Sequence, residues 1–200
     1  ERREVEAASV PLDMREKLRF VADDALVTRL DRVFGVKQDA QPATLTREID
    51  RVVGLITAGA GSPYGGRDVF LQRCAGCHRL FNQGGDLGPD LTAFKRDDLP
   101  NLVLAIVNPN AEIREGYEPF VLTKTDGTVH SGFLAGQDVR QVVMRDMAGL
   151  SVTVERKAIG SLKGLGTSLM PPELLSGLSD RELRDLFSYL RMTQPLVGKE

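Results

Sequence analysis

Five consecutive residues, Cys74-Ala75-Gly76-Cys77-His78, constrain this chain more than any other part of its sequence. They include both cysteines of the 200-residue chain and one of its two histidines. On a helix, positions 74, 77 and 78 stand at i, i+3 and i+4, so two sulfurs and one imidazole are expected on a single face. The small residues between them add little bulk. A flat, wide group can therefore meet all three side chains at once.

The C-x-x-C-H spacing is that of covalent haem attachment, in which two thioethers hold the porphyrin and the histidine ligates its iron. Three other interpretations compete. A thioredoxin-like dithiol needs a strand directly before the motif, whereas residues 66–73 have a helical pattern. A zinc site needs four ligands, for which Cys and His supply only Cys74, Cys77, His78 and the distant His130. A disulfide closes a very small loop and leaves His78 without a role. We therefore interpret the motif as the site of one covalent haem c.

Iron held by His78 has a second axial position, for which the chain offers five methionines and His130. Pro171 disfavours helical backbone at the preceding Met170 and so holds this methionine in an extended loop. The other methionines follow helix or strand patterns: Met14, Met144, Met147 and Met192. We expect Met170 to be the second iron ligand. The alternatives are that Met170 only fills a gap in the core, or that His130 is the ligand.

Hydrophobic periodicity separates an N-terminal helical extension, residues 1–60, from a haem domain, residues 61–200. The extension is predicted to contain two amphipathic helices, at about residues 13–34 and 45–56. A glycine-rich stretch at 59–66 has the composition of a linker. The boundary is placed there.

Three segments are expected to follow the linker: a motif helix from about Gly66 to Cys77, an irregular loop at 80–91 and a helix at 96–107. The hydrophobic period then changes to two. The turn signals Asp126-Gly127 and Ala148-Gly149 predict two hairpins in a small antiparallel sheet at about 117–156. A turn-rich stretch at 160–177 precedes Ser179-Asp180-Arg181-Glu182, which predicts the capping box of a last helix.

The charge balance argues against a nucleic-acid partner, and the hydropathy argues against a membrane-spanning segment. Lys and Arg number 26 and Asp and Glu 28, a net charge of -2 without a long run of one sign. Nucleic-acid binders carry a basic patch, so no nucleic-acid partner is expected. The longest aliphatic run, Leu102–Val107, is far shorter than the roughly 18 apolar residues of a membrane span. The chain is therefore not expected to span a membrane.

At these residues the chain resembles the class I c-type cytochromes. The shared features are Gly66 and Phe70, the haem motif, Gly88-Pro89-Asp90-Leu91, Met170-Pro171 and the terminal run Leu186–Leu190. The chain is more similar still, from Gly66 to about Arg191, to the haem-binding domain abundant in secreted planctomycete and verrucomicrobial proteins. This second resemblance is carried by the runs Gly84–Leu91, Ile106–Ala111, Ile113–Glu118 and Ser168–Pro171.

The resemblance implies a mainly α, cytochrome c-like helical fold with an inserted small antiparallel β-sheet, preceded by two N-terminal helices. It also implies that the Pro89 carbonyl accepts a hydrogen bond from Nδ1 of His78 and so orients the ring. Pro89 otherwise serves only as a turn proline. Arg114 and Tyr117 are predicted to bind a haem propionate, because a partly buried carboxylate needs a donor or a cation. The alternative for both is an ordinary surface position.

An iron held between His78 and Met170 leaves no vacant position for a substrate, so one-electron transfer is the chemistry left. We expect a monohaem c-type cytochrome domain that is not itself an enzyme. It would carry single electrons from a dehydrogenase partner or domain to a respiratory acceptor, since similar domains are often fused to dehydrogenase domains. Covalent haem attachment takes place outside the cytoplasm, which predicts a periplasmic or otherwise extracytoplasmic location.

Two alternatives to an electron carrier are open. The first is a haem enzyme or gas sensor in which the sixth iron position is open or displaceable. The second is a structural or interaction module in which the haem only stabilises the folded chain. Binding of carbon monoxide separates the first alternative from the electron carrier, and a redox titration separates the second.

Overall fold

The computed structural model describes residues 24–34 and 43–197. The chain divides into two compact units. Of the described residues, 24–34 and 112–169 belong to the sheet unit, and 43–111 and 170–197 belong to the helical unit. Of the first predicted helix, residues 24–34 form α2 (Asp24–Phe34), and residues 13–23 lie outside the described residues.

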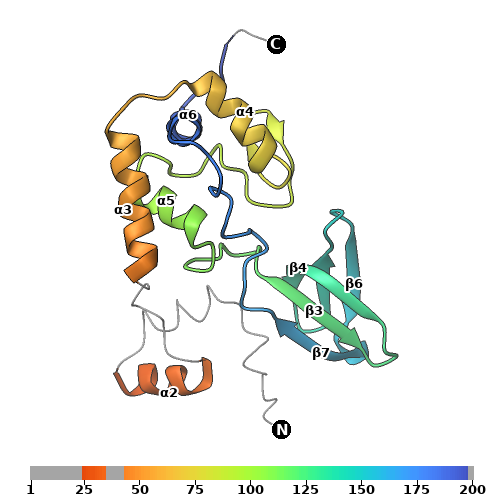
Figure 1. Ribbon diagram of the computed structural model, residues 1–200. Helices are drawn as coiled ribbons and strands as arrows, with labels where there is room; N and C mark the ends of the chain where they lie inside the picture. Colours follow the sequence, from red (N-terminus) through yellow and green to blue (C-terminus); the bar gives the residue numbers. More distant parts are fainter. Residues whose placement is uncertain (1–23, 35–42, 198–200) are drawn as a thin grey trace. The chain divides into compact units, whose positions relative to one another are not determined.

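The helical unit is built on four described helices, which Figure 1 labels: α3 (Ala43–Thr57), α4 (Pro63–Arg73), α5 (Leu99–Val107) and α6 (Asp180–Leu190). α3 packs against α5 and α6, and α4 packs against α6. Their shared core includes Val52, Phe70, Leu80, Val103, Leu186 and Phe187. Because Val52 belongs to α3 and Phe70 to α4, the second predicted helix and the motif helix contribute to one core.

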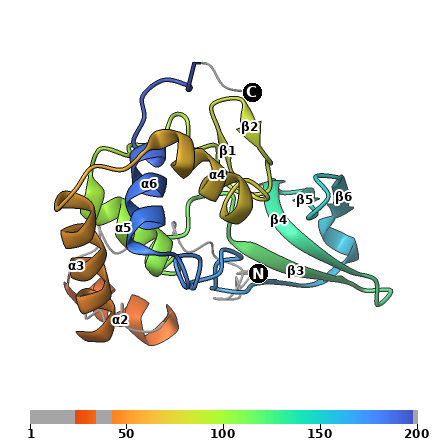
Figure 2. The same cartoon turned by 45° about the horizontal axis from the view of Figure 1, so that its top comes forward.

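α4 lies across α6 and approaches it most closely at Gly66 (Figure 2). A Cβ atom on Gly66 would lie 1.9 Å from the carbonyl oxygen of Asp185 and 2.8 Å from Cβ of Tyr189, so only glycine fits there. Asp185 is buried, and its Oδ1 accepts a hydrogen bond of 2.6 Å from the N–H of Ser62, the N-cap of α4. The crossing therefore fixes the direction in which α4 leads into Cys74.

The sheet unit contains one antiparallel sheet of five strands in the order β6-β5-β4-β3-β7. The strands are β3 (Pro119–Lys124), β4 (Val129–Gln137), β5 (Gln141–Arg145), β6 (Ser151–Glu155) and β7 (Ile159–Gly164). The two predicted hairpins are confirmed at β3–β4 and β5–β6. Gly127 and Gly149 adopt positive φ in their turns, which explains why both turn signals contain glycine.

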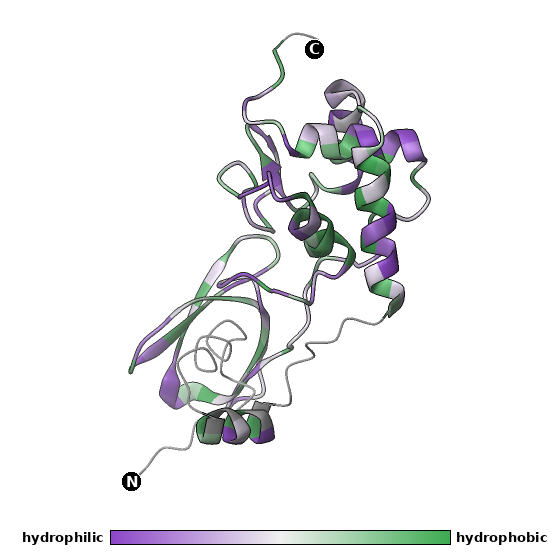
Figure 3. Cartoon of the chain, turned by 90° about the vertical axis from the view of Figure 1, so that its left-hand side faces the viewer, coloured by the Kyte–Doolittle hydropathy of each residue, from purple (hydrophilic) through white to green (hydrophobic). Residues whose placement is uncertain are grey.

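The outermost strands of this sheet, β6 and β7, are joined by only the short 3₁₀ turn Arg156–Ala158. Such a connection reaches at most about 14 Å, whereas four flat strand spacings cover about 19 Å. The sheet must therefore curl, which brings its outer strands β6 and β7 towards each other, and Figure 3 shows this curved sheet. The curled sheet has a core of its own, formed by Phe120, Leu122, Val142, Met144, Val154 and Leu162.

The expected mainly α, cytochrome c-like fold is wrong, because the structure is mixed α/β with 35% helical and 22% strand residues. The sheet continues to Gly164 because β7, in a stretch expected to hold only turns, pairs with β3. A second pair, β1 (Arg79–Leu80) with β2 (Gln83–Gly84), lies in the loop expected to be irregular. Glycines interrupt β2 and β7, which weakens the alternating pattern that marks a strand.

Helix ends also differ from the predicted ones. α4 begins at Pro63, since proline is pre-organised for the first position of a helix, and it ends at Arg73. α5 begins only at Leu99, after its N-cap Asp98. The capping box of Ser179 and Glu182 at the start of α6 is confirmed. No described helix combines the length and the apolar character needed to cross a membrane.

Candidate functional site

The residues from Cys74 to His78 follow α4 as a series of turns. Cys74 caps α4, and the N–H groups of Cys74 and Ala75 both donate to the carbonyl of Phe70, at 2.8 and 2.9 Å. The N–H of His78 then donates to the carbonyl of Cys74 at 2.9 Å, which is the spacing of an α-helical turn. The predicted helix up to Cys77 is thus wrong in its length, but one helix-like turn still joins the first cysteine to the histidine.

The imidazole of His78 has a defined orientation. Its Nδ1 lies 2.9 Å from the carbonyl oxygen of Pro89, which is the contact that the resemblance implies. Because a carbonyl oxygen can only accept, Nδ1 carries a proton, and in the neutral imidazole Nε2 then keeps a lone pair. Among the described residues, no hydrogen-bond partner occupies Nε2. His78 is therefore prepared to act as a ligand through Nε2.

A glycine-rich loop, residues 83–91, holds the backbone of the motif and of the following Arg79 through three hydrogen bonds. The N–H groups of Gly85, Gly88 and Leu91 donate to the carbonyls of Ala75, Cys77 and Arg79, at 2.8, 2.7 and 2.8 Å. Gly88 also faces the imidazole, since a Cβ atom there would lie 2.7 Å from Cε1 of His78. The loop thus supports one face of the ring and leaves no room for a side chain.

Gly88→Ala is expected to push the His78 ring away from the Pro89 carbonyl. Loss of such a supporting hydrogen bond weakens metal ligation about 10- to 100-fold. In a haem-loaded protein a proton would compete with iron for Nε2, so the acid transition of such a protein should move upward by about 1 to 2 pH units. The measurement is an acid titration followed by the visible spectrum. Gly54→Ala, at an open position of α3, is the control, and an unchanged transition in Gly88→Ala would contradict the expectation.

The two thiols are free and differ in exposure. Cys77 is exposed, whereas Cys74 is half-buried against the core of the helical unit, and burial raises the pKa of its thiol to about 11. A dithiol oxidoreductase needs a thiol with a lowered pKa. A helix, α4, also precedes the motif where a thioredoxin-like site needs a strand. Both observations disfavour a dithiol site.

Protein-ligated zinc does not match the motif either. Within residues 24–34 and 43–197, no three His, Cys, Asp or Glu side chains are grouped so as to hold a metal ion. A zinc site would need Cys74, Cys77 and His78 to converge on one ion. Covalent haem makes no such demand, because the thiols bond to the edge of the porphyrin and only His78 meets the iron. The residues present therefore fit haem better than zinc.

Met170 belongs to the same unit as His78 and is half-buried at a bend. The segment that it opens is held near the motif: Nη1 of Arg73 donates to the carbonyl of Ser176 at 3.4 Å, and Leu175 belongs to the core against which Cys74 packs. On the other side of Met170, Leu169 is 44% exposed. Leu169, the residue before Met170, therefore does not shield the Met170 side chain from water.

Arg114 and Tyr117 belong to the sheet unit, whereas the motif belongs to the helical unit. The ring of Tyr117 packs edge-on against Phe133, with 5.7 Å between the ring centroids, and the Arg145 guanidinium lies 5.9 Å from the Tyr117 centroid. These contacts give Tyr117 a packing role in the sheet unit. Arg114 is exposed. Their binding to a propionate stays a prediction, as does ligation by His130, which lies on β4 opposite Leu122.

Arg96, which no sequence motif marks, is only 8% exposed. Its Nη1, Nη2 and Nε donate to the carbonyls of Leu190, Thr92 and Phe94, at 2.7, 3.2 and 3.4 Å. Burial lowers the pKa of this guanidinium. Arg96 stands in the charged run Lys95-Arg96-Asp97-Asp98, and such a run is typical of a solvated surface. Only the packing of the chain distinguishes it from its neighbours.

A scan of the chain against protein-family models finds no match, and a search of curated proteins finds no relative. A proposal about function therefore depends on the chemistry of the site itself.

Proposed function

We propose that the chain attaches one haem c through thioethers to Cys74 and Cys77 and carries single electrons as a c-type cytochrome domain. The observation that supports this most is the state of His78. Its Nδ1 is bound to the Pro89 carbonyl, its Nε2 is left for a ligand, and it directly follows two free thiols on one turn. This is the set of groups that covalent haem attachment requires.

When bound, the haem supplies an iron that gains and loses one electron. His78 would bind the iron through Nε2, and its hydrogen bond to the Pro89 carbonyl would make the imidazole a stronger electron donor to the metal. The half-buried Cys74 and the exposed Cys77 would hold the porphyrin through thioethers. Met170 would supply a second protein ligand and so exclude a substrate from the iron.

The partners follow from this chemistry. A single-electron carrier needs a donor and an acceptor, and we propose a periplasmic dehydrogenase, or a dehydrogenase domain of the same protein, as the donor and a respiratory protein as the acceptor. Redox encounters commonly use small, transient interfaces. The exposed side of the motif, at Cys77, is where such a partner would approach. Haem attachment then places the protein outside the cytoplasm.

A haem enzyme or gas sensor is the second candidate, and one observation favours it. Leu169 is 44% exposed, and Pro171 and Pro172 are also exposed, so the residues on either side of Met170 face solvent. A thioether on such a segment can leave the iron and let a small molecule bind. Both candidates contain the haem, and they differ only in how firmly the sulfur of Met170 binds the iron.

Visible spectra recorded before and after reduction with dithionite, with and without carbon monoxide, test the proposal. We expect the oxidised protein to show the far-red band of a thioether on iron, and the reduced protein to bind no carbon monoxide at neutral pH. Ready binding of carbon monoxide together with a missing far-red band would favour the second candidate. A chain without any haem spectrum would contradict both.

A further inference from the structure

Arg96 is the one cation among the described residues whose side chain is buried. Its three hydrogen bonds all end on neutral backbone carbonyls, and it forms no salt bridge with a carboxylate of the described residues. A buried guanidinium is costly unless its N–H groups are bonded, and the partial negative charge at the end of a helix favours a cation. Leu190 is the last residue of α6, so Arg96 occupies such an end.

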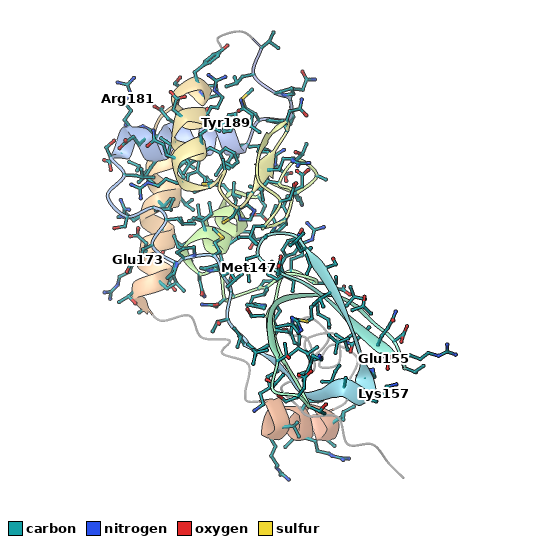
Figure 4. The ribbon with its side chains drawn as sticks, turned by 90° about the vertical axis from the view of Figure 1, so that its right-hand side faces the viewer. Met147, Glu155, Lys157, Glu173, Arg181 and Tyr189 are labelled. Carbon is teal, nitrogen blue, oxygen red and sulfur yellow. The ribbon has the colours of Figure 1, made fainter. Side chains whose placement is uncertain are left out.

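The contacts of Arg96 join two distant parts of the chain. Leu190 ends α6, whereas Thr92 and Phe94 belong to the loop that follows Pro89. The guanidinium also lies over the ring of Phe81, 5.5 Å from its centroid, and Phe81 in turn packs edge-on against Tyr189 of α6. Figure 4 labels Tyr189 within the helical unit. Arg96 thus fastens the loop to α6.

A short series of hydrogen bonds leads from Arg96 to the histidine. The hydroxyl of Thr92 accepts from the N–H of Phe81 at 2.7 Å, and the N–H of Thr92 donates to Oδ1 of Asp90 at 2.7 Å. Asp90 directly follows Pro89, whose carbonyl accepts from Nδ1 of His78. The N–H groups of Gly88 and Leu91 hold the loop on either side of Pro89. If Thr92 loses its bond to Arg96, the Pro89 carbonyl loses a further restraint on its position against the imidazole.

We propose that Arg96 is a positioning residue for the iron ligand: by fastening residues 92–94 to the end of α6, it holds the Pro89 carbonyl against His78 and so orients the imidazole. The inference rests on the proposed function, because an oriented imidazole matters only if His78 ligates iron. A neutral apolar side chain at position 96 leaves three carbonyls without their donor. The loop then has to shift to satisfy them with water.

The test is the rate at which the Nδ1 proton of His78 exchanges with solvent, measured by NMR on the reduced, haem-loaded protein. We expect Arg96→Met to speed this exchange about tenfold or more, which corresponds to about 1.4 kcal/mol at 25 °C. Backbone amides of Val69 in α4 and Leu186 in α6 should keep their rates. Arg96→Lys keeps the charge but lacks the planar fork, and should give an intermediate exchange rate.

Asp185→Asn is the matched control, because Asp185 is also 8% exposed and lies in the same unit but contacts Ser62 instead of the loop. It should weaken the helical unit without a selective effect on His78. The proposal for Arg96 is wrong if Arg96→Met leaves the Nδ1 exchange unchanged, or speeds it no more than the amides of α4 and α6.

Three further outcomes are decisive. If Arg96→Met does not fold, Arg96→Lys decides alone: an exchange rate equal to that of the unchanged chain contradicts the proposal, and a rate raised selectively at Nδ1 of His78 supports it. A loaded protein with unaffected exchange overturns the role of Arg96 and leaves the haem proposal standing. A chain that takes up no covalent haem overturns both.

Discussion

Met170→Ala is expected to let the reduced protein bind carbon monoxide at neutral pH and to remove the far-red thioether band from the oxidised spectrum. The reason is that alanine has no atom able to occupy the sixth iron position, which then accepts an external ligand. The midpoint potential should fall by on the order of 0.1 V or more, within the span of about 0.8 V that axial ligands cover. Spectra under carbon monoxide and a redox titration measure both effects.

Met192→Ala is the matched control, because Met192 is also a half-buried methionine of the helical unit, packed against its core. It should keep the far-red band and exclude carbon monoxide. If Met170→Ala behaved in the same way as this control, Met170 would not be the ligand. His130→Ala would then show whether the other histidine takes its place.

Gly66→Ala is expected to destabilise the helical unit severely. The added Cβ would lie 1.9 Å from the Asp185 carbonyl oxygen, an atom of rigid helix backbone, so α4 and α6 must separate. Overpacking of this kind costs about 1–3 kcal/mol, and we expect about 3 kcal/mol because no flexible side chain can yield. Urea unfolding followed by far-ultraviolet circular dichroism measures the change in the free energy of unfolding.

Gly54→Ala provides the control for this effect. Gly54 lies in α3, where nothing stands within 4 Å of an added Cβ. Alanine lowers the backbone entropy that folding must remove, so this variant should be more stable by about 0.5–1 kcal/mol. Equal unfolding midpoints for Gly66→Ala and the unchanged chain would show that α4 and α6 do not cross closely at residue 66.

Local signals in the sequence predicted the elements that local chemistry determines. The capping box of Ser179 and Glu182 marked the start of α6, and Asp126-Gly127 marked the β3–β4 turn, because both depend on a few neighbouring residues. β7 was missed because it pairs with β3 across some forty residues of chain and carries a glycine in its alternating pattern. The fold class was wrong because the sheet, expected as a small insertion, has five strands and a core of its own, and a second strand pair lies in the helical unit.

The candidate site shows the same difference between residues that a local pattern marks and residues whose role depends on packing between distant parts of the chain. Cys74, Cys77 and His78 stand out in the sequence because the spacing of a haem-attachment motif is local, and their role stays a proposal. The contact between His78 and the Pro89 carbonyl, which the resemblance implies, is present in the structure. Arg96 could not be found, since its burial results from packing between residues 94 positions apart. Met170 illustrates a third case: its proline neighbour indicates an extended backbone, but neither the sequence nor the exposure of Leu169 reports what its sulfur binds.

The central claim is that Cys74 and Cys77 carry a covalently bound haem whose iron His78 ligates. The intact mass of the chain, purified from a host that attaches haem to C-x-x-C-H motifs and measured under denaturing conditions, tests it most directly. The account predicts the mass of the polypeptide plus one haem, and the bare polypeptide mass for the double variant Cys74→Ala, Cys77→Ala. The bare mass for the unchanged chain would contradict the account.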